Sequence, residues 1–215
     1  GQGFIDRAPL MDLAGLTGIG TLTADYDNDG DGDLLITRDG WYGAAPNVLL
    51  RNDGPDADGW LRFVDVADAA GVAGDGSSLS AVWGDLDNDG HLDLIVANGV
   101  AGDGSPNRVY LADGSGGFVD GTSSSGVAAG RTVGSTLGDY DNDGDLDLYL
   151  ANANKLNTFY RNDSDQATVL FTDVTRQTRT QLPLGAHFAF FFDYDNDGRL
   201  DLFCSEMSDL TATVV

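Results

Sequence analysis

Positive charge is scarce in this chain of 215 residues: 11 Lys and Arg stand against 35 Asp and Glu, for a formal net charge of −24. A surface of that sign repels a phosphate backbone or an anionic lipid headgroup. We therefore expect no nucleic-acid partner and no anionic membrane as a partner.

Cysteine and long apolar runs are also missing. Cys204 is the only cysteine, so no intrachain disulfide forms, and its apolar surroundings favour a buried thiol over a nucleophile. No run approaches the roughly 18 apolar residues of a membrane span. Residues 1–10 show neither the basic nor the apolar region of a signal peptide, as in a processed secreted chain or a cytosolic one.

Glutamate is nearly absent, because every acidic residue except Glu206 is Asp. The short Asp side chain holds its carboxylate close to the backbone, which suits turns and oxygen-ligand cation sites. The 30 glycines and the scarcity of helix formers indicate strands and tight loops.

One acidic loop, Asp-x-Asp-Asn-Asp-Gly-x-x-Asp, occurs four times, and successive copies start 60, 54 and 54 residues apart. The copies occupy residues 25–33, 85–93, 139–147 and 193–201. Apolar runs follow each loop, and segments such as Asn157–Asp163 and Phe171–Asp173 recur after them. Each unit thus reads as about four short strands, which at this period is typical of a propeller blade. The sequence predicts a single all-β repeat domain over residues 1–215, with at most one helical turn in Asp65–Gly71; stacked β-solenoid turns are the rival fold, but their periods are usually shorter.

The two ends of the chain look like complementary halves of one blade. Aligned on the preceding repeat, Thr211–Val215 falls on a strand whose hairpin partner is Phe-x-Asp, and Phe4-Ile5-Asp6 stands at the N-terminus. Three arrangements stay open: a closed four-bladed ring, an open array completed head to tail by a neighbouring chain, which propagates as a filament, and a fragment of a larger propeller.

The acidic loop has the chemistry of a calcium site. Calcium takes six to eight oxygen ligands, and Asp at loop positions 1, 3, 5 and 9 supplies carboxylates while Gly at position 6 permits a sharp reversal. Position 7 is expected to offer only its backbone carbonyl and so to vary, as it does. The predicted side-chain ligands are Asp25, Asp27, Asp29, Asp33, Asp85, Asp87, Asp89, Asp93, Asp139, Asp141, Asp143, Asp147, Asp193, Asp195, Asp197 and Asp201. The predicted carbonyl ligands are those of Asp31, His91, Asp145 and Arg199. We expect about four Ca²⁺ ions and no catalytic residues.

Three other interpretations of the loop fit the sequence less well. Plain Asp/Asn/Gly turns do not account for four carboxylates converging in four copies, since such groups repel without a cation. An EF-hand needs Glu at position 12, where this chain has Ile36, Val96, Leu150 and Cys204. Magnesium demands stricter octahedral geometry than this loop suggests.

The stretch Asp139–Leu150, its sister loops, the Asn-x-x-Tyr-Arg-Asn-Asp strands and the Phe-x-Asp-Val stretches resemble the FG-GAP/VCBS repeats of integrin-α-like β-propellers. The resemblance is greatest to the cartilage acidic protein group and its bacterial relatives. It implies a propeller, calcium in each loop, an extracellular or cell-surface setting, and a role in adhesion or matrix structure. Propellers of this family usually have seven blades, whereas four loops are present here.

These observations predict a secreted, calcium-binding structural or adhesive protein that is not an enzyme. A glycan- or protein-binding module is the alternative, with Trp41, Tyr42 and Trp60 in predicted loops suited to stacking on sugars. A calcium-dependent polysaccharide- or lipid-cleaving enzyme is the weaker alternative, because His91 and His187 read as a loop residue and a core or capping residue.

Overall fold

The computed structural model describes residues 8, 13–39, 45–74, 77–99, 105–128, 130–153, 156–166, 168–180, 186–206 and 212–214. Within these residues the regular secondary structure is almost entirely β-strand. The strands are β1 (Gly20–Ala24), β2 (Asp33–Thr37), β3 (Val48–Pro55), β4 (Leu61–Asp65), β5 (Ser78–Gly84), β6 (Asp93–Asn98), β7 (Arg108–Ala112), β8 (Phe118–Asp120), β9 (Thr132–Gly138), β10 (Asp147–Asn152), β11 (Thr158–Asn162), β12 (Phe171–Asp173), β13 (Ala186–Phe192), β14 (Asp201–Glu206) and β15 (Ala212–Val214).

Each repeat forms one antiparallel sheet, which we call a blade. Blades 1 to 3 each have four strands in chain order, β1 to β4, β5 to β8 and β9 to β12. Blade 4 has three, β13 to β15. The predicted four-stranded blades are therefore confirmed for the first three repeats. The stretch Phe4-Ile5-Asp6, expected to pair with the last strand, lies outside the described residues.

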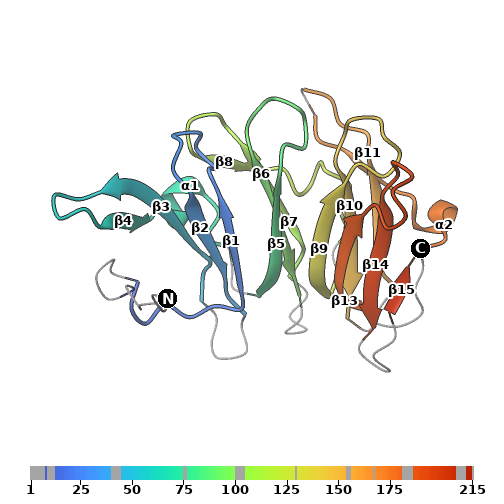
Figure 1. Ribbon diagram of the computed structural model, residues 1–215, viewed down its shortest axis with the longest axis horizontal. Coiled ribbons are helices and arrows are strands. Elements are labelled where there is room, and N and C mark those ends of the chain that lie inside the picture. The colour runs from blue at the N-terminus through green and yellow to red at the C-terminus, as the bar shows by residue number, and fades with distance from the viewer. Residues whose placement is uncertain are drawn as a thin grey trace.

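The blades stand side by side in chain order, as Figure 1 shows, and the first strand of each contacts the first strand of the next. A groove of about 430 Å³ runs along these four first strands, lined among others by Leu22, Ser80, Ser135 and Phe188. This arrangement, with first strands at a common axis, is that of propeller blades.

The strand that follows each acidic loop is the most buried of its blade. All six residues of β6 and of β10 are buried, as continuous apolar runs predict for strands covered on both faces. In β2, by contrast, buried and half-buried residues alternate. The expectation of double-sided burial thus holds best in the two blades that have a neighbour on each side.

Two single helical turns follow the Phe-x-Asp strands, α1 (Ala67–Ala70) and α2 (Thr175–Thr178). The first lies inside the predicted stretch Asp65–Gly71, where Gly71 ends it with a left-handed φ of 84°. The second occupies the same place in the third repeat and was not predicted. No helix in the described part of the chain has the length and hydropathy that a membrane crossing requires.

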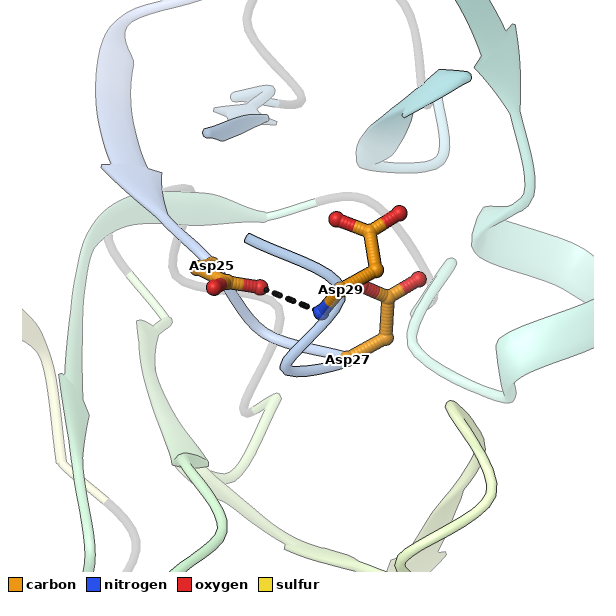
Figure 2. A group of neighbouring side chains, drawn as sticks. All are labelled: Asp25, Asp27 and Asp29. Atoms are coloured by element: carbon orange, nitrogen blue, oxygen red, sulfur yellow. Dashed lines mark hydrogen bonds between the residues drawn. The ribbon is translucent and has the colours of Figure 1, made fainter. Parts of the chain in front are cut away.

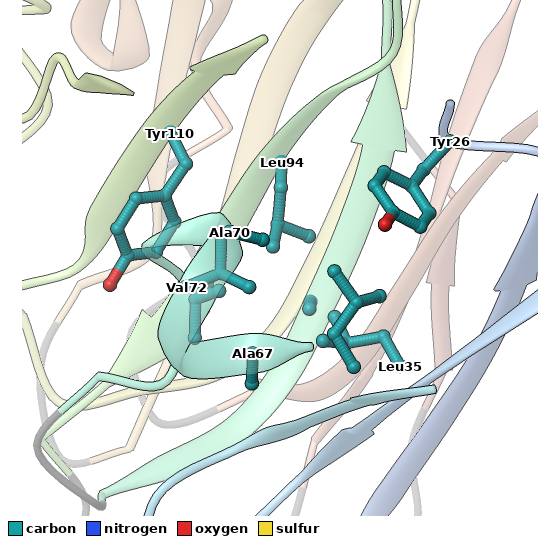
Figure 3. Close-up of a cluster of buried hydrophobic side chains, with 10 residues drawn as sticks. Tyr26, Leu35, Ala67, Ala70, Val72, Leu94 and Tyr110 are labelled. Atoms are coloured by element: carbon teal, nitrogen blue, oxygen red, sulfur yellow. The ribbon is translucent and has the colours of Figure 1, made fainter. Parts of the chain in front are cut away.

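The apolar cores lie between the blades. Leu35 and Leu49 of blade 1 pack against Leu94, Val96 and Tyr110 of blade 2, and Figure 3 shows this cluster with Ala67 and Ala70 of α1 beside it. Two further clusters fill the junctions between blades 2 and 3 and between blades 3 and 4. Each blade is therefore stabilised mainly by its neighbours.

Close approach of the blades explains small residues on the first strands. A Cβ atom added at Gly134 of β9 would lie 2.6 Å from the carbonyl oxygen of His187 in β13. A Cβ at Gly138 would lie 2.7 Å from the Phe191 ring, and one at Gly84 would lie 2.5 Å from Leu137. The face that each of these strands turns toward the next blade, which we call its front face, accordingly carries small residues.

Blade 4 departs from this rule on its front face. The register of β13 places Phe188 and Phe192 where β9 has Gly134 and Gly138. Phe188 is 70% exposed and Phe190 is 47% exposed. Blade 4 thus ends the described array with an uncovered aromatic face.

We expect the substitution Gly134→Ala to destabilise the protein by about 1–3 kcal/mol, because the new methyl group meets a backbone oxygen that no side-chain rotation can move. Denaturant unfolding followed by circular dichroism measures this. Gly32→Ala is the matched control, since no heavy atom lies within 4 Å of its added Cβ. Equal stability of the two variants would contradict the close packing of blades 3 and 4.

Candidate metal centre

Each acidic loop connects the first strand of a blade to its second strand. The first loop starts at Asp25, directly after β1, and its last residue, Asp33, is the first residue of β2. The other three loops occupy the same place between β5 and β6, β9 and β10, and β13 and β14. Twenty predicted ligand residues therefore lie at one kind of strand connection.

The loop backbone reverses through two left-handed residues. Gly at position 6 has φ between 85° and 98° in the four copies, as the sequence predicted. Position 4 is also left-handed, with φ of 59° at Asn28, 57° at Asn88, 59° at Asn142 and 59° at Asn196. Asn tolerates this conformation better than most residues with a side chain. The recurrence of Asn at position 4 was the signal for it, and sequence reasoning did not use that signal.

The carboxylate at position 1 organises the turn through backbone N–H groups. Asp25 accepts hydrogen bonds from the N–H of Asp29 and of Gly30, both at 3.0 Å. Figure 2 shows the first of these bonds, with the Asp27 and Asp29 side chains beside it. The same pair of bonds recurs in the other three loops.

The carboxylate at position 9 ties the loop to its blade. Asp33 accepts hydrogen bonds from the N–H of Tyr26 at 3.2 Å and from the N–H of Asn52 in β3 at 2.8 Å. Asp93 and Asp147 make the equivalent bonds to their own loops and third strands. All three Asp residues are buried, so these bonds replace the water that their carboxylates lose.

In each loop the structure brings three predicted ligands together, with ligand oxygens all within 4.8 Å of one another. The four groups are Asp25, Asp27 and Asp29; Asp85, Asp87 and Asp93; Asp139, Asp141 and Asp147; and Asp193, Asp195 and Asp197. The fourth predicted carboxylate of each loop, respectively Asp33, Asp89, Asp143 and Asp201, is not part of its group. The carbonyl ligands at position 7 stay a prediction.

The electrostatics of these groups suit a cation. Ionised carboxylates this close repel by roughly 3 kcal/mol per pair at an effective dielectric constant of about 20. One oxygen, Oδ1, of Asp27 and of Asp87 is buried without a hydrogen-bond donor. Burial, followed by the charges of neighbouring Asp residues, raises the pKa of Asp27 and Asp87 above the usual value. An oxygen-seeking cation would supply both the missing partner and the missing positive charge, so the donor set fits calcium.

Position 2 of the first three loops couples the site to the core, which the sequence analysis missed. Tyr26 is 4% exposed and stacks on Trp83 of the next blade, with ring centroids 6.2 Å apart. Leu86 is likewise buried, in the second core cluster, against which Leu137 of blade 3 packs. The side chain at position 2 of the acidic loop therefore packs into the apolar junction between two blades.

A buried Asn directly before the third strand of each of the first three blades is a further structural residue. Asn47, Asn107 and Asn157 each accept a hydrogen bond through Oδ1 from a backbone N–H at the end of the second strand, at 3.1, 3.0 and 2.9 Å. The recurrence of this Asn in three repeats was visible in the sequence, but only the fold gives it a role.

The residues considered for other functions are placed as follows. Trp41 and Tyr42 lie outside the described residues, and Trp60 is half-buried in the turn between β3 and β4. His187 lines the groove along the first strands. Cys204 is fully buried, which confirms the interpretation of a core thiol. The absence of catalytic residues stays a prediction.

Fold and loops together define a class: proteins built from repeated four-stranded blades, each with an Asp-rich loop between its first two strands. FG-GAP-like repeats match residues 20–96, 99–150 and 139–204, most of the chain. The chain belongs to the FG-GAP-like repeat family.

Two curated relatives share most of the chain. Cartilage acidic protein 1 of Homo sapiens is 27% identical over 198 residues, which is 88% of this chain and 29% of the relative. Cartilage acidic protein 1 of Mus musculus is 28% identical over 198 residues, 88% of this chain and 30% of the relative. The chain spans less than a third of the length of these relatives. The predicted resemblance is confirmed at the level of the repeat and of these relatives.

The calcium-free protein should become more stable on mild acidification. Burial raises the pKa of Asp93 and of Asp147 to about 6, against about 3.9 in an unfolded chain. As the pH falls from about 6 to about 4, the folded state takes up protons that the unfolded state does not, so its stability rises. Thermal melts in a chelator between pH 7 and pH 4.5 measure this. With saturating calcium the rise should vanish, and a chelated protein that only loses stability over this range would contradict the assignment.

Proposed function

We propose that the chain is a calcium-binding blade-repeat module with a structural or adhesive role outside cells. The observation that carries the proposal is the fourfold convergence of carboxylates, with buried oxygens of Asp27 and Asp87 that lack a donor. In this proposal about four Ca²⁺ ions sit in the four loops and join the first two strands of each blade. They cross-link the strands, as disulfides do in many secreted proteins.

An extracellular setting is supported by composition and by the relatives. The relatives are named for cartilage and for acidity, and this chain carries a net charge of −24. Calcium sites of extracellular modules typically bind with dissociation constants of 10⁻⁴–10⁻³ M. Half-exposed loops such as the first and fourth fit such weak sites.

Calcium removal should lower the melting temperature. A site filled at a free calcium concentration 100-fold above its dissociation constant adds about 2.7 kcal/mol, which is roughly 5–10 °C for a domain of this size. Differential scanning calorimetry with calcium and with EDTA measures the shift. An unchanged melt would overturn the calcium assignment.

The substitution Asp87→Asn separates a metal site from a mere turn by the sign of its effect. Without calcium the variant should melt a few degrees higher than the wild type, because one buried, repelled charge is gone. With calcium it should melt lower, because a ligand is gone. The control Asp58→Asn changes an exposed Asp outside the acidic loops. It should change the free energy of unfolding by no more than about 0.5 kcal/mol, with or without calcium.

Head-to-tail self-association is a second candidate function, favoured by the front face of blade 4. Beside the exposed Phe188 and Phe190, Tyr194 at position 2 of the fourth loop is 67% exposed, whereas Tyr26 and Leu86 are buried by the next blade. An aromatic face of this kind on a sheet marks an interaction surface.

We propose that this aromatic face binds blade 1 of a second copy of the chain, on the face of blade 1 that is turned away from blade 2 and that we call its back face. At the second and third junctions a large residue of the following blade fills the space beside a small one, as Leu137 does beside Gly84 and Phe191 beside Gly138. The exposed Thr23 of β1 holds the position equivalent to Leu137 and Phe191. On the two open faces the sizes are the opposite of those at the internal junctions: Phe192 on the front face of blade 4 is large, and Thr23 on the back face of blade 1 is small. Since these are different surfaces, the contact propagates unless it closes.

Sedimentation velocity over a concentration series, with calcium, tests this contact. We expect oligomers that disappear in the double variant Phe188→Ser/Phe190→Ser and, independently, in Thr23→Trp, which fills the acceptor face. Electron microscopy should show short filaments or rings. Compact monomers at every concentration would refute self-association and leave the calcium proposal untouched.

A further inference from the structure

Neighbouring acidic loops touch through the Asn at position 4. The amide Nδ2 of Asn28 in loop 1 lies 3.1 Å from Nδ1 of His91 and 3.4 Å from the carbonyl oxygen of Gly90, both in loop 2. In the next pair, Nδ2 of Asn88 donates to Oδ1 of Asp145 in loop 3 at 2.6 Å. In both pairs the amide reaches position 7 of the following loop.

The acceptor position matters for the chemistry of the site. Position 7 is where a backbone carbonyl is expected to bind the cation, and its side chain is free for other contacts. The donor, at position 4, lies between the carboxylates of positions 3 and 5. An ion that orders loop 2 through Asp87 therefore also orders the adjacent Asn88, and through Asn88 it restrains Asp145.

Loops 2 and 3 have a second, buried connection. Asn162 of β11 is 2% exposed, and its Nδ2 donates to the carbonyl oxygen of Leu86 in loop 2 at 2.9 Å. Its backbone N–H donates to Asp147 of loop 3 at 2.9 Å. Blade 2 has Ala112 at this position, so loops 1 and 2 lack the second connection.

Loops 3 and 4 supply an internal control. Among the described residues, the side chain of Asn142 makes no hydrogen bond to loop 4, although its φ of 59° equals that of Asn28. Arg199 at position 7 of loop 4 turns its guanidinium back to Asp197 of its own loop, at 2.6 Å. The same residue type in the same conformation is thus linked to the next loop twice and unlinked once.

We propose that Asn28 and Asn88 are positioning residues that couple calcium binding between successive loops, with the strongest coupling between loops 2 and 3. This rests on the proposed calcium function. Filling one loop orders its Asn, which then pre-orders position 7 of the next loop, so the second ion orders less of the chain on binding. Repulsion between bound ions opposes this at every junction, whereas the Asn links favour it only at the first two.

The test is calcium titration by isothermal calorimetry of Asn28→Gly, Asn88→Gly and the matched control Asn142→Gly. Gly keeps the left-handed backbone and removes only the amide. We expect the first two variants to flatten the binding curve and to weaken calcium affinity at the affected loops about two- to tenfold. Asn142→Gly should stay within about twofold of the wild type.

A double-mutant cycle identifies the contact itself. Asp145→Ala removes the acceptor but keeps the backbone carbonyl, so it should reproduce the loss of Asn88→Gly, and the two changes together should lose little more than either alone. Asp145→Asn keeps an acceptor oxygen and should retain most of the coupling.

The possible outcomes distinguish the two proposals. A wild-type protein that takes up no calcium overturns both. A wild type that binds calcium while Asn88→Gly behaves like Asn142→Gly, or while the double-mutant losses simply add, overturns the coupling alone.

Discussion

The rest of this structure is arranged around four groups of carboxylates, and within each group the ligand oxygens lie within 4.8 Å of one another. The backbone keeps the carboxylates together, because N–H groups of the loop bind both oxygens at position 1 and the carboxylate at position 9 reaches the third strand. That arrangement removes hydration from Asp33, Asp93 and Asp147 without supplying a positive charge. Arg51 and Arg161 are each committed to an Asp two residues away at 2.7 Å. A divalent cation would supply a counter-charge of the right size and ligand preference.

The same loops control how the blades meet. A blade of short strands buries too little apolar surface to stand alone, so its stability comes from the clusters on either side. Position 2 of the loop takes part in these clusters, since Tyr26 stacks on both Trp83 and Phe118 of the next blade. Anything that orders the loop also fixes Tyr26, and with it the junction. Under the proposed calcium function, metal binding and blade packing are therefore coupled, which is why a chelator is expected to act on the whole array.

Much of the fold and of the candidate site could be predicted from the sequence, because the same physical requirement recurs in every repeat. The spacing of the acidic loops predicted the blades, and the apolar runs after them predicted β6 and β10. Other features could not be found, since they depend on which blade faces which. Neither the contact of Asn162 with Leu86 nor the approach of Gly134 to His187 follows from a pattern within one repeat. The aromatic front face of β13 was visible as Phe188 to Phe192, but its exposure depends on the register of β13 and on the packing of neighbouring blades.

The near-absence of glutamate now has a reason in geometry. The loop carboxylates accept hydrogen bonds from backbone N–H groups two, four and five residues ahead, a reach that fits one methylene and not two. Asp65, Asp113, Asp120 and Asp173, outside the acidic loops, make the same two-residue bond in turns between strands. Aspartate thus serves as a turn-forming residue throughout the fold, and among the residues that the structure describes, only in the acidic loops do three carboxylates converge as a cation site would require. Asp113 has a lowered pKa because its hydrogen bonds favour the charged form, whereas burial raises the pKa of Asp93. The anionic form of Asp is therefore favoured at an ordinary turn such as Asp113 and disfavoured at buried loop positions such as Asp93, a contrast that supports the proposed cation sites.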